Sequence, residues 1–443
     1  MKNTNELPNN EEISKLHPSE VVELISDIGV NDESHLQTIM ENIDKEIMGD
    51  VLVELSDAKL KIALSFLDNE TIKEAVEELE TDDATDLIQN IETLDKDKAH
   101  TILESLDQED QEDINWLKQY EEDEAGAFMQ TELFSAYSHE TIQEAKERLI
   151  EQKSKKELEN IYVLFVVNQK EELEAVIPLE DLFITSYNTK LSEFIGNEKY
   201  APRTATSRDN ILNVAKMVSD YDLPVVPVVE YRNRLIGRIT SDDIHDIIND
   251  SATEQIYHLA GLGESADYDS FFDNFKDRLA WLCVNLATAI LASFVISFFD
   301  DTLRSVIALA ILMPIVASMG GNAGTQTITV IVRQLALGQI KFENTKTVLK
   351  KEFLLSLLNG CVFALLIGII AYIWFTDMKL SLVIGGAMIL NIITSGIFGA
   401  LIPMVLKRIN VDPAIASTVI ITTVTDVVGF LSFLLFAQHF LIP

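Results

Sequence analysis

The sequence predicts a multi-domain protein with an all-α N-terminal part, a duplicated α/β part, a connecting helix and a five-helix transmembrane part. Three observations predict this fold class. Leucine–acid pairs recur at near-constant spacing before residue 120, a strand–turn–strand–helix pattern occurs twice between residues 126 and 250, and five long apolar stretches follow residue 275. With 443 residues, 47% hydrophobic and 24% charged, the chain is long enough for several domains and apolar enough for a membrane part.

Charge is distributed very unevenly along the chain. Of 71 acidic and 34 basic residues, only 8 and 11 follow residue 275, so the first 275 residues carry 63 and 23, a net charge of −40. Phosphate binding needs clustered Lys and Arg, so nucleic acid is not an expected partner. An acidic surface can serve solubility alone, but beside a membrane part it favours cations as ligands. The two cysteines, Cys283 and Cys361, lie in apolar stretches and indicate neither a disulfide framework nor a zinc cluster.

Residues 1–125 are expected to form an acidic, superhelical, all-α N-domain. The repeated leucines, Leu55, Leu67, Leu79, Leu94 and Leu106, are spaced by 12, 12, 15 and 12, and the acids that follow most of them are Asp68, Glu80, Asp95 and Asp107. An acid after an apolar residue is a good helix start, so the repeat predicts short helices stacked as a solenoid. Asp82, Asp83 and Asp86 could hold a hydrated cation. They could equally form a solvated first turn that the helix dipole favours.

Residues 126–190 and 191–250 are predicted to be two copies of one α/β unit. At a constant offset of 62, Val166-Val167 matches Val228-Val229, Leu173 matches Leu235, Ala175 matches Gly237 and Asp181 matches Asp243. The run Leu223-Pro-Val-Val-Pro-Val-Val229, followed by Arg234-Leu-Ile-Gly-Arg-Ile-Thr-Ser-Asp-Asp-Ile244, resembles the CBS motif. Two copies make a tandem CBS pair, which is usually a regulatory module.

A single nucleotide site is expected in this pair. In many CBS domains a Thr-x-x-Asp segment binds the ribose of an adenine nucleotide, and Thr240 and Asp243 fit it, which makes ATP a candidate ligand. The first copy has Pro178 where the threonine would be. Asp243 could instead be an N-terminal helix residue or a cation ligand.

Residues 251–277 are expected to connect this pair to a transmembrane domain at 278–443. The connector can be helical at both ends around a loop at Gly261–Gly263. Five spans of roughly 20 apolar residues or more are predicted at about 279–299, 303–333, 353–376, 380–406 and 413–440. The N-terminus shows no apolar core of signal-peptide type, and the second and fourth loops carry most of the loop Lys and Arg. Both features place the N-terminus in the cytoplasm and the C-terminus outside.

Two features of the spans indicate an ion pathway. Pro314 and the run Met319–Gln326 are expected to break the second span, and broken backbone at membrane depth persists only inside protein or beside water. The last span holds one charge, Asp426, whose burial costs about 2.5–3.5 kcal/mol at mid-membrane. The candidate pore or ion-binding residues are Asp426, Gly320, Gly321, Asn322, Gly324, Thr418, Thr422 and Thr425. Contacts between helices could explain the Thr and Gly residues of the last span, but not Asp426.

The chemistry of these residues favours a hard divalent cation. Mg²⁺ takes oxygen ligands and keeps most of its water, although an oxygen-lined site does not exclude Co²⁺, Mn²⁺ or Ni²⁺ by ligand type. One carboxylate per chain is few for a site that binds a divalent cation, and a twofold homodimer would supply two.

The order of these parts, together with Gly320-Gly-Asn-Ala-Gly-Thr-Gln326 and Thr425-Asp-Val-Val-Gly429, resembles the MgtE family of magnesium channels and transporters over nearly the whole chain. The resemblance implies a plasma-membrane homodimer whose second and fifth helices line one pore, with Mg²⁺ at Asp426. It also implies that cytoplasmic Mg²⁺ closes the pore through the connector, called the plug helix in that family. By position, the regulatory acids are Asp222, Asp243, Asp246 and Glu254. Ser251 and Gln255 replace two family acids, which implies weaker sensing.

The spans lack the usual parts of an intramembrane hydrolase, such as HExxH, paired acids or a Ser-His arrangement, so no enzymatic activity is expected. Two alternatives to a magnesium pore stay open: a membrane-anchored CBS sensor of cations or nucleotide without transport, or a transporter of another divalent cation such as Co²⁺.

Overall fold

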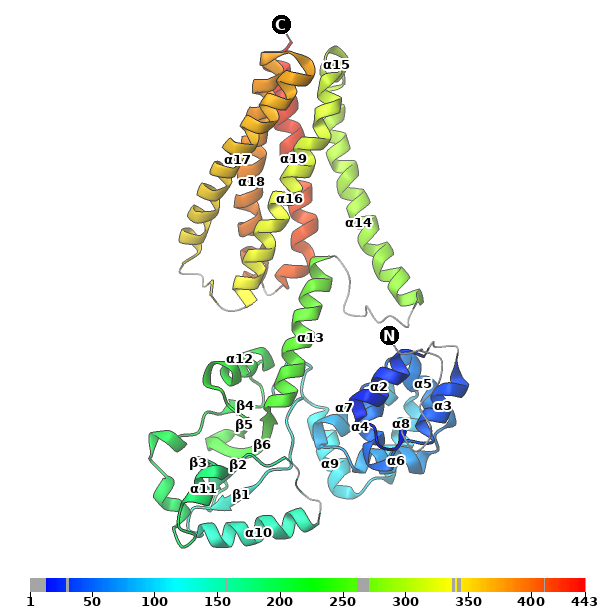
Figure 1. The fold of residues 1–443 in the computed structure, drawn as a ribbon, viewed down its shortest axis with the longest axis vertical. Coiled ribbons are helices and arrows are strands. Elements are labelled where there is room, and N and C mark those ends of the chain that lie inside the picture. The colour runs from blue at the N-terminus through cyan, green and yellow to red at the C-terminus, as the bar shows by residue number, and fades with distance from the viewer. Residues whose placement is uncertain are drawn as a thin grey trace. The chain divides into compact units, whose positions relative to one another are not determined.

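The computed structural model describes residues 13–28, 32–155, 158, 160–260, 271–336, 339–340, 344–409 and 411–442. The chain divides into two compact units, Met1–Asp250 and Ser251–Pro443, drawn in Figure 1. The expected connector loop at Gly261–Gly263 and the loop residue Lys341 lie outside the described residues.

Short stacked helices form the first part of unit 1. They are α2 (Pro18–Ser26), α3 (Glu33–Met40), α4 (Met48–Val53), α5 (Asp57–Phe66), α6 (Asn69–Glu77), α7 (Thr81–Leu94), α8 (Lys96–Ser105) and α9 (Gln108–Leu117), with a 3-10 turn η1 (Lys45–Ile47). Four of them begin after the leucine–acid pairs, with Asp68, Glu80, Asp95 and Asp107 at the N-cap positions. The carboxylates of Asp68 and Asp95 accept the N–H of Thr71 (2.8 Å) and Lys98 (3.0 Å), which satisfies donors that a helix start leaves free. The predicted helix starts are confirmed.

Two three-stranded sheets with the same connectivity follow. The first contains β1 (Ser135–Tyr137), β2 (Val163–Val167) and β3 (Leu173–Pro178), and the second β4 (Ala205–Thr206), β5 (Val225–Glu230) and β6 (Arg234–Thr240). In each sheet the first two strands are parallel and the last two antiparallel. A bulge falls between Val166 and Val167 in one sheet and between Val228 and Val229 in the other, 62 residues apart as the duplication predicts.

Burial on both faces explains why the central strands are continuous apolar runs. Side chains alternate between the two faces of a strand. On β2, Leu164 and Val166 join the core of their own copy, where α10 (Ile142–Ser154) packs, whereas Val163, Phe165 and Val167 join a core shared with the other sheet. β5 divides its valines in the same way. Helices α11 (Leu179–Ile184), α12 (Ile211–Tyr221) and α13 (Ser241–Leu259) and the 3-10 turns η2 (Leu191–Phe194), η3 (Glu198–Tyr200) and η4 (Tyr231–Asn233) complete the pair.

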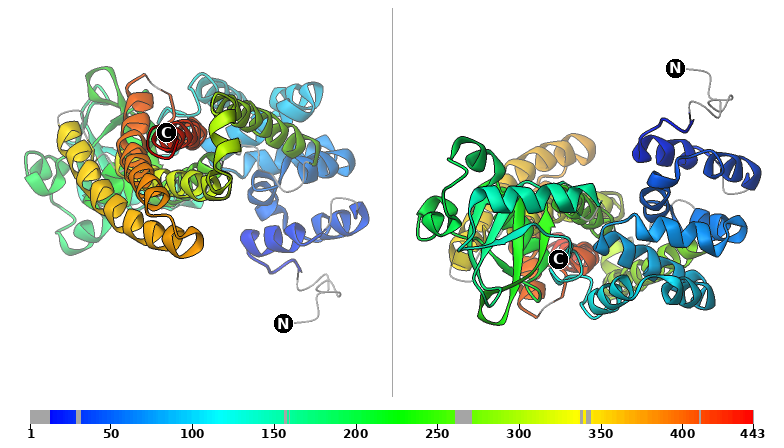
Figure 2. Two further views of the ribbon diagram at one scale, coloured as in Figure 1. Left: turned by 90° about the horizontal axis from the view of Figure 1, so that it is seen from above. Right: turned by 90° about the horizontal axis from the view of Figure 1, so that it is seen from below.

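Unit 2 is a helical bundle. Its elements are α14 (Phe271–Ser297), α15 (Asp300–Ser305), α16 (Ala308–Ala336), α17 (Thr345–Phe375), α18 (Met378–Arg408) and α19 (Pro413–Phe440). Among the described residues, five of its helices are long and apolar enough to cross a membrane, as predicted. Most of these five helices are longer than the predicted spans, because polar residues continue the helix beyond its apolar part. Helix α18 contacts α16, α17 and α19, and Figure 2 shows it between α17 and α19.

Candidate ion pathway and acidic cluster

Helix α16 is continuous from Ala308 to Ala336, so the predicted break in the second span is wrong. Pro314 removes only one backbone N–H, and the glycines keep theirs, so intrahelical hydrogen bonds continue through Gly320-Gly-Asn-Ala-Gly324. In hydrocarbon this outcome is favoured, because an unpaired backbone group has no water to bind. The pathway therefore cannot depend on carbonyl groups freed by a broken helix.

The glycines of α16 permit close helix contacts instead. A Cβ added at Gly320 would lie 2.2 Å from Nδ2 of Asn391 on α18, and one at Gly324 would lie 2.5 Å from Cγ1 of Ile421 on α19. Both glycines are buried. They bring the backbone of α16 against its two neighbours, a common use of small residues between membrane helices.

A polar stripe lies on the open side of α16. Ser318, Asn322, Thr325 and Thr329 follow at spacings of 4, 3 and 4 and are all exposed in the single chain, so they share one helical face. The hydroxyls of Thr325 and Thr329 donate to backbone carbonyls of their own helix, Gly321 O (3.1 Å) and Thr325 O (2.9 Å). An amide such as Asn322 at membrane depth is favourable only beside water, ions or other protein. This stripe is unsuited to lipid.

Helix α19 lies beside α16, and the candidate acid is one helical turn from a contact between the two helices. Asp426 and Thr422 are half-buried, and a Cβ added at Gly321 would lie 3.8 Å from Cγ2 of Thr422. The structure therefore brings together the two segments that the sequence singled out. Thr425, by contrast, is fully buried and donates to Thr422 O (3.1 Å), so its hydroxyl faces the protein interior.

Two residues of α18 that the sequence reasoning missed join these helices. Asn391 is fully buried and donates from Nδ2 to Val316 O of α16 (2.8 Å), while Ser395, also fully buried, donates to Gly320 O (2.7 Å). An available signal was the asparagine at the centre of an apolar span, with a serine one helical turn after it.

The C-terminal end of α13 contacts the start of α19 within unit 2. The buried ring of His258 lies with Nδ1 2.7 Å from Oδ2 of Asp412, and its Nε2 lies 3.7 Å from Oε1 of Glu254. The hydroxyl of Thr418 donates to Leu259 O (3.1 Å). Thr418 is thus engaged with the connecting helix. His258 and Asp412 carried no sequence signal, because they are 154 residues apart.

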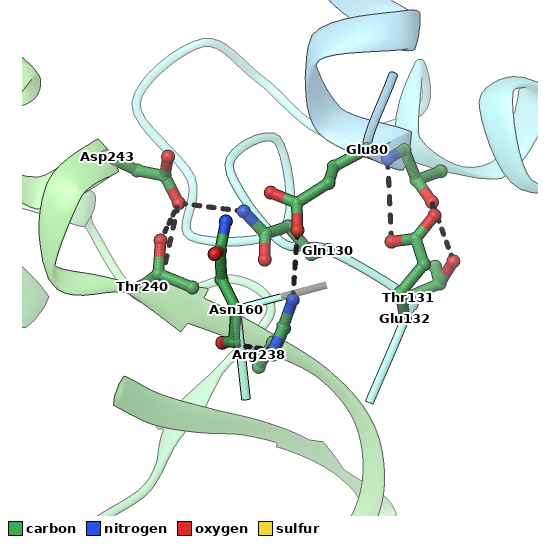
Figure 3. A network of polar contacts seen from close by, with 9 residues as sticks. Glu80, Gln130, Thr131, Glu132, Asn160, Arg238, Thr240 and Asp243 are labelled. Carbon is green, nitrogen blue, oxygen red and sulfur yellow. Dashed lines mark hydrogen bonds and ion pairs between the residues drawn. The ribbon is translucent and has the colours of Figure 1, made fainter. Parts of the chain in front are cut away.

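An acidic cluster lies in unit 1 between the start of α7 and the second CBS copy. Glu80 pairs with the buried Arg238 (3.0 Å), and Gln130 donates to Asp243 (3.1 Å), as Figure 3 shows. Asp82 is buried, and its Oδ1 has no hydrogen-bond partner within the described part of the chain. A buried acceptor without a partner costs about 1–3 kcal/mol, so the cluster is not optimised for stability.

The carboxylates of this cluster resist ionisation. Burial raises the pKa of Glu80 to about 7, and the charge of Arg238 offsets this only in part. Burial and then the Asp243 carboxylate raise the pKa of Asp83 to about 7 and that of Asp82 well above its ordinary value. Burial also raises the pKa of Asp243. Like charges held near one another favour a bound cation or proton.

The other candidate regulatory acids are more open. Asp86, Asp222 and Asp246 are exposed, Asp222 lies in the left-handed region at the end of α12 (φ 51°), and Glu254 is half-exposed on α13. The pKa of Glu54 is raised mainly by burial and next by the nearby charge of Asp246. Across the residues the structure describes, no three acid, His or Cys side chains are close enough to form a metal site by themselves.

The two CBS copies differ at the expected nucleotide position. In the second copy, Oδ2 of Asp243 accepts from the Thr240 hydroxyl (2.6 Å) and from its backbone N–H (3.3 Å). In the first copy, the matching Asp181 is buried and pairs with Lys199 (2.7 Å), and Pro178 stands at the N-cap position of α11 without a side-chain hydrogen bond. The first position is therefore filled by an internal ion pair.

The fold and this site define a multi-pass membrane protein with a large acidic extramembrane part. The profile described as a divalent cation transporter, MgtE, matches residues 313–436, the MgtE intracellular N domain matches 16–123, and the CBS domain matches 199–250. The magnesium transporter MgtE of Thermus thermophilus is 31% identical over 332 residues, covering 74% of this chain and 72% of that protein. The magnesium transporter MgtE of Enterococcus faecalis is 32% identical over 329 residues, with the same coverage. The chain belongs to the MgtE family.

Solved structures of extramembrane parts are also similar. A crystal structure of the cytosolic domain of the Mg²⁺ channel MgtE in complex with ATP aligns with a TM-score of 0.49 at 27% identity, covering 54% of this chain and 93% of that one. The soluble part of a magnesium transporter aligns with a TM-score of 0.48 at 28% identity, covering 55% and 91%.

The close contact at Gly320 makes a stability prediction. Gly320→Ala should lower the free energy of unfolding by about 1–3 kcal/mol, as overpacking usually does, because its Cβ would meet the Asn391 amide. The matched control is Gly368→Ala on α17, where the added Cβ would lie at an ordinary 3.5 Å from Ser381 O. Thermal unfolding of both full-length variants in detergent is the measurement. Equal melting temperatures for the two would contradict the packing.

The acidic cluster makes a pH prediction. Glu80 and Asp83 have folded pKa values raised to about 7, so the folded state binds more protons than the unfolded state between about pH 4 and 7. Stability should therefore fall as pH rises through this range, and added Mg²⁺ should raise the melting temperature more at pH 8 than at pH 6. The measurement is thermal unfolding of the full chain at both pH values with and without Mg²⁺.

A pair of variants checks that this pH effect comes from the cluster. Asp83→Asn should reduce both the pH dependence and the Mg²⁺ effect. Asp97→Asn, at an exposed first-turn acid of α8, should change neither. An identical response in Asp83→Asn and the parent chain would rule the cluster out as the source.

Proposed function

We propose that the chain is a homodimeric, plasma-membrane magnesium channel or transporter that carries Mg²⁺ into the cell and closes when cytoplasmic Mg²⁺ is high. The observation that carries the proposal is the polar stripe of α16, a helix that packs against α19, the helix of Asp426. Both helices are long enough to cross a membrane, and the chain belongs to a family with magnesium transporters. Oxygen groups and one acid suit a hard divalent cation that keeps most of its water.

A twofold axis along the polar stripe would complete the pathway. In the single chain, Ser318, Asn322, Thr325 and Thr329 have no cover, and a second copy would supply it with the same surface, as symmetric dimers do. The two copies of Asp426 would then give a site of charge −2. Gly320 and Gly324 act in this arrangement through close packing, and Asn322, Thr422 and Asp426 offer the oxygens.

Closing by cytoplasmic Mg²⁺ would act through the acidic cluster and the connecting helix. Ions near Asp82, Asp83, Asp86, Asp222, Asp243, Asp246 and Glu254 would reduce repulsion between acids and favour a compact state. A ligand shifts such an equilibrium only by its differential affinity for the two states. The contacts of His258 with Asp412 and of Leu259 with Thr418 link the connecting helix directly to the start of α19. Thr240 and Asp243 form the position where ATP would bind.

The proposal is tested by Mg²⁺ flux into liposomes that contain the purified full-length protein. Asp426→Asn removes the charge at nearly constant shape and should lower the flux about tenfold or more, because a divalent site loses its only acid. Asp377→Asn is the matched control, since this residue caps α18 through its side-chain oxygen and Asn caps equally well. Wild-type flux in Asp426→Asn would remove Asp426 from the pathway. No flux in the parent chain would favour a sensor without transport.

The link between α13 and α19 predicts a change in closing. His258→Ala should raise the cytoplasmic Mg²⁺ that halves the flux by about fivefold or more, since coupling between sites typically amounts to 5–150-fold. The control is His245→Ala, at an exposed position of the same helix. Flux measured against internal Mg²⁺ gives both values. Unchanged closing in His258→Ala would show that this contact does not transmit the signal.

A further inference from the structure

Asn391 occupies a closely fitted position between the two helices of the proposed pathway. Its carboxamide lies where a Cβ on either of two glycines would be: Nδ2 is 2.2 Å from the Cβ position of Gly320 on α16 and 2.7 Å from that of Gly429 on α19. Gly429 follows Asp426 by three residues, and Gly320 precedes Asn322 by two. The amide therefore touches both helices close to the residues that would meet the ion.

Two donors of α18 bind successive turns of α16. Asn391 donates to Val316 O, and Ser395, one turn further along α18, donates to Gly320 O, one turn further along α16. The Ser395 hydroxyl also lies 2.8 Å from Asn391 O of its own helix, so its one proton is shared between two acceptors. The pair fixes α16 along its axis and around it, because two contacts one turn apart prevent both sliding and rotation.

Stability does not explain the asparagine. Its Oδ1 is buried and has no hydrogen-bond partner among the described residues, and a buried acceptor without a partner is unfavourable. A leucine has nearly the same shape and brings no acceptor that needs a partner. The carbonyl of Val316 would stay paired without Asn391, because α16 is helical there and the N–H of Gly320 bonds to it. The replacement therefore removes an unsatisfied buried group without creating another.

We propose that Asn391 and Ser395 are positioning residues for ion passage: they hold α16 against α19 so that the polar stripe and Asp426 face the same path. This inference rests on the proposed function. Neither side chain contacts the ion itself, because both are fully buried.

The test compares Asn391→Leu and Ser395→Ala with the parent chain in the liposome assay. For both we expect a flux at least about tenfold lower, as small misplacements of reacting groups commonly produce, with a melting temperature equal to or above that of the parent chain for Asn391→Leu. Loss of transport without loss of stability is what a purely structural residue does not show. The matched control is Thr394→Val on the same helix, whose hydroxyl donates only to Leu390 O of α18. It should transport like the parent chain.

A second measurement does not depend on transport. With Cys283 and Cys361 replaced by alanine, Gly321→Cys and Thr422→Cys place a thiol pair across α16 and α19, where the added Cβ lies 3.8 Å from Thr422 Cγ2, close to disulfide geometry. Oxidation with copper phenanthroline should cross-link this pair about tenfold more slowly in Asn391→Leu than with Asn391 or in Thr394→Val, because the helices lose their relative position.

The two measurements separate the possible failures. Parent-like flux or parent-like cross-linking in Asn391→Leu would overturn the positioning role. If the parent chain carries no Mg²⁺, the proposed function fails, while the cross-linking rate still decides whether Asn391 sets the position of α16 against α19.

Discussion

The structure of the membrane unit depends on the absence of water partners for its backbone. Every N–H and C=O group at that depth must be paired within the protein, which keeps α16 helical through Pro314 and four further helix-weakening residues. Glycine is a poor helix former because it loses more backbone entropy than other residues. At Gly320 and Gly324 this entropy cost is offset by close contacts with α18 and α19 that no larger residue would allow. Close packing thus takes the place of a broken backbone as the reason for this glycine-rich run.

Close packing also separates two kinds of polar group in the bundle. The amide of Asn391 and the hydroxyls of Ser395 and Thr425 are fully buried and bind backbone carbonyls. Asn322, Thr325 and Asp426 remain at least partly open. Asn391 and Ser395 hold α18 against α16, as polar side chains do in lipid, whereas Thr425 bonds within α19. The three more open residues make no hydrogen bond with a neighbouring helix within the described part of the chain. Thr325 donates to Gly321 O and Asn322 to the Ser318 hydroxyl of their own helix, and the proposed path at a dimer axis would explain why these residues stay open.

In unit 1 the main constraint is different: several carboxylates are buried close to one another. Glu80, Asp82, Asp83 and Asp243 lie near one another, and Glu80 also pairs with Arg238. Their pKa values are raised first by burial and then by the neighbouring carboxylates. A bound cation therefore stabilises this cluster of acids more than it would stabilise a cluster of neutral side chains. The two copies of the duplicated unit differ in charge at this position. In the first copy the matching acid, Asp181, is neutralised by Lys199, so the unbalanced negative charge lies at the second copy.

The sequence by itself determined the elements and their order. Helix starts at Asp68 and Asp95, the paired bulges at Val166 and Val228, and the five apolar helices all follow from local patterns: caps, alternation and span length. Only the tertiary structure decided the continuity of α16, where the bilayer and packing against α18 and α19 overrule the local preference of Pro and Gly. It also decided the contacts of Asn391 with Gly320 and Gly429 and of His258 with Asp412. These pairs are far apart in the chain, so no local pattern records them, and whether they meet depends on how whole helices pack.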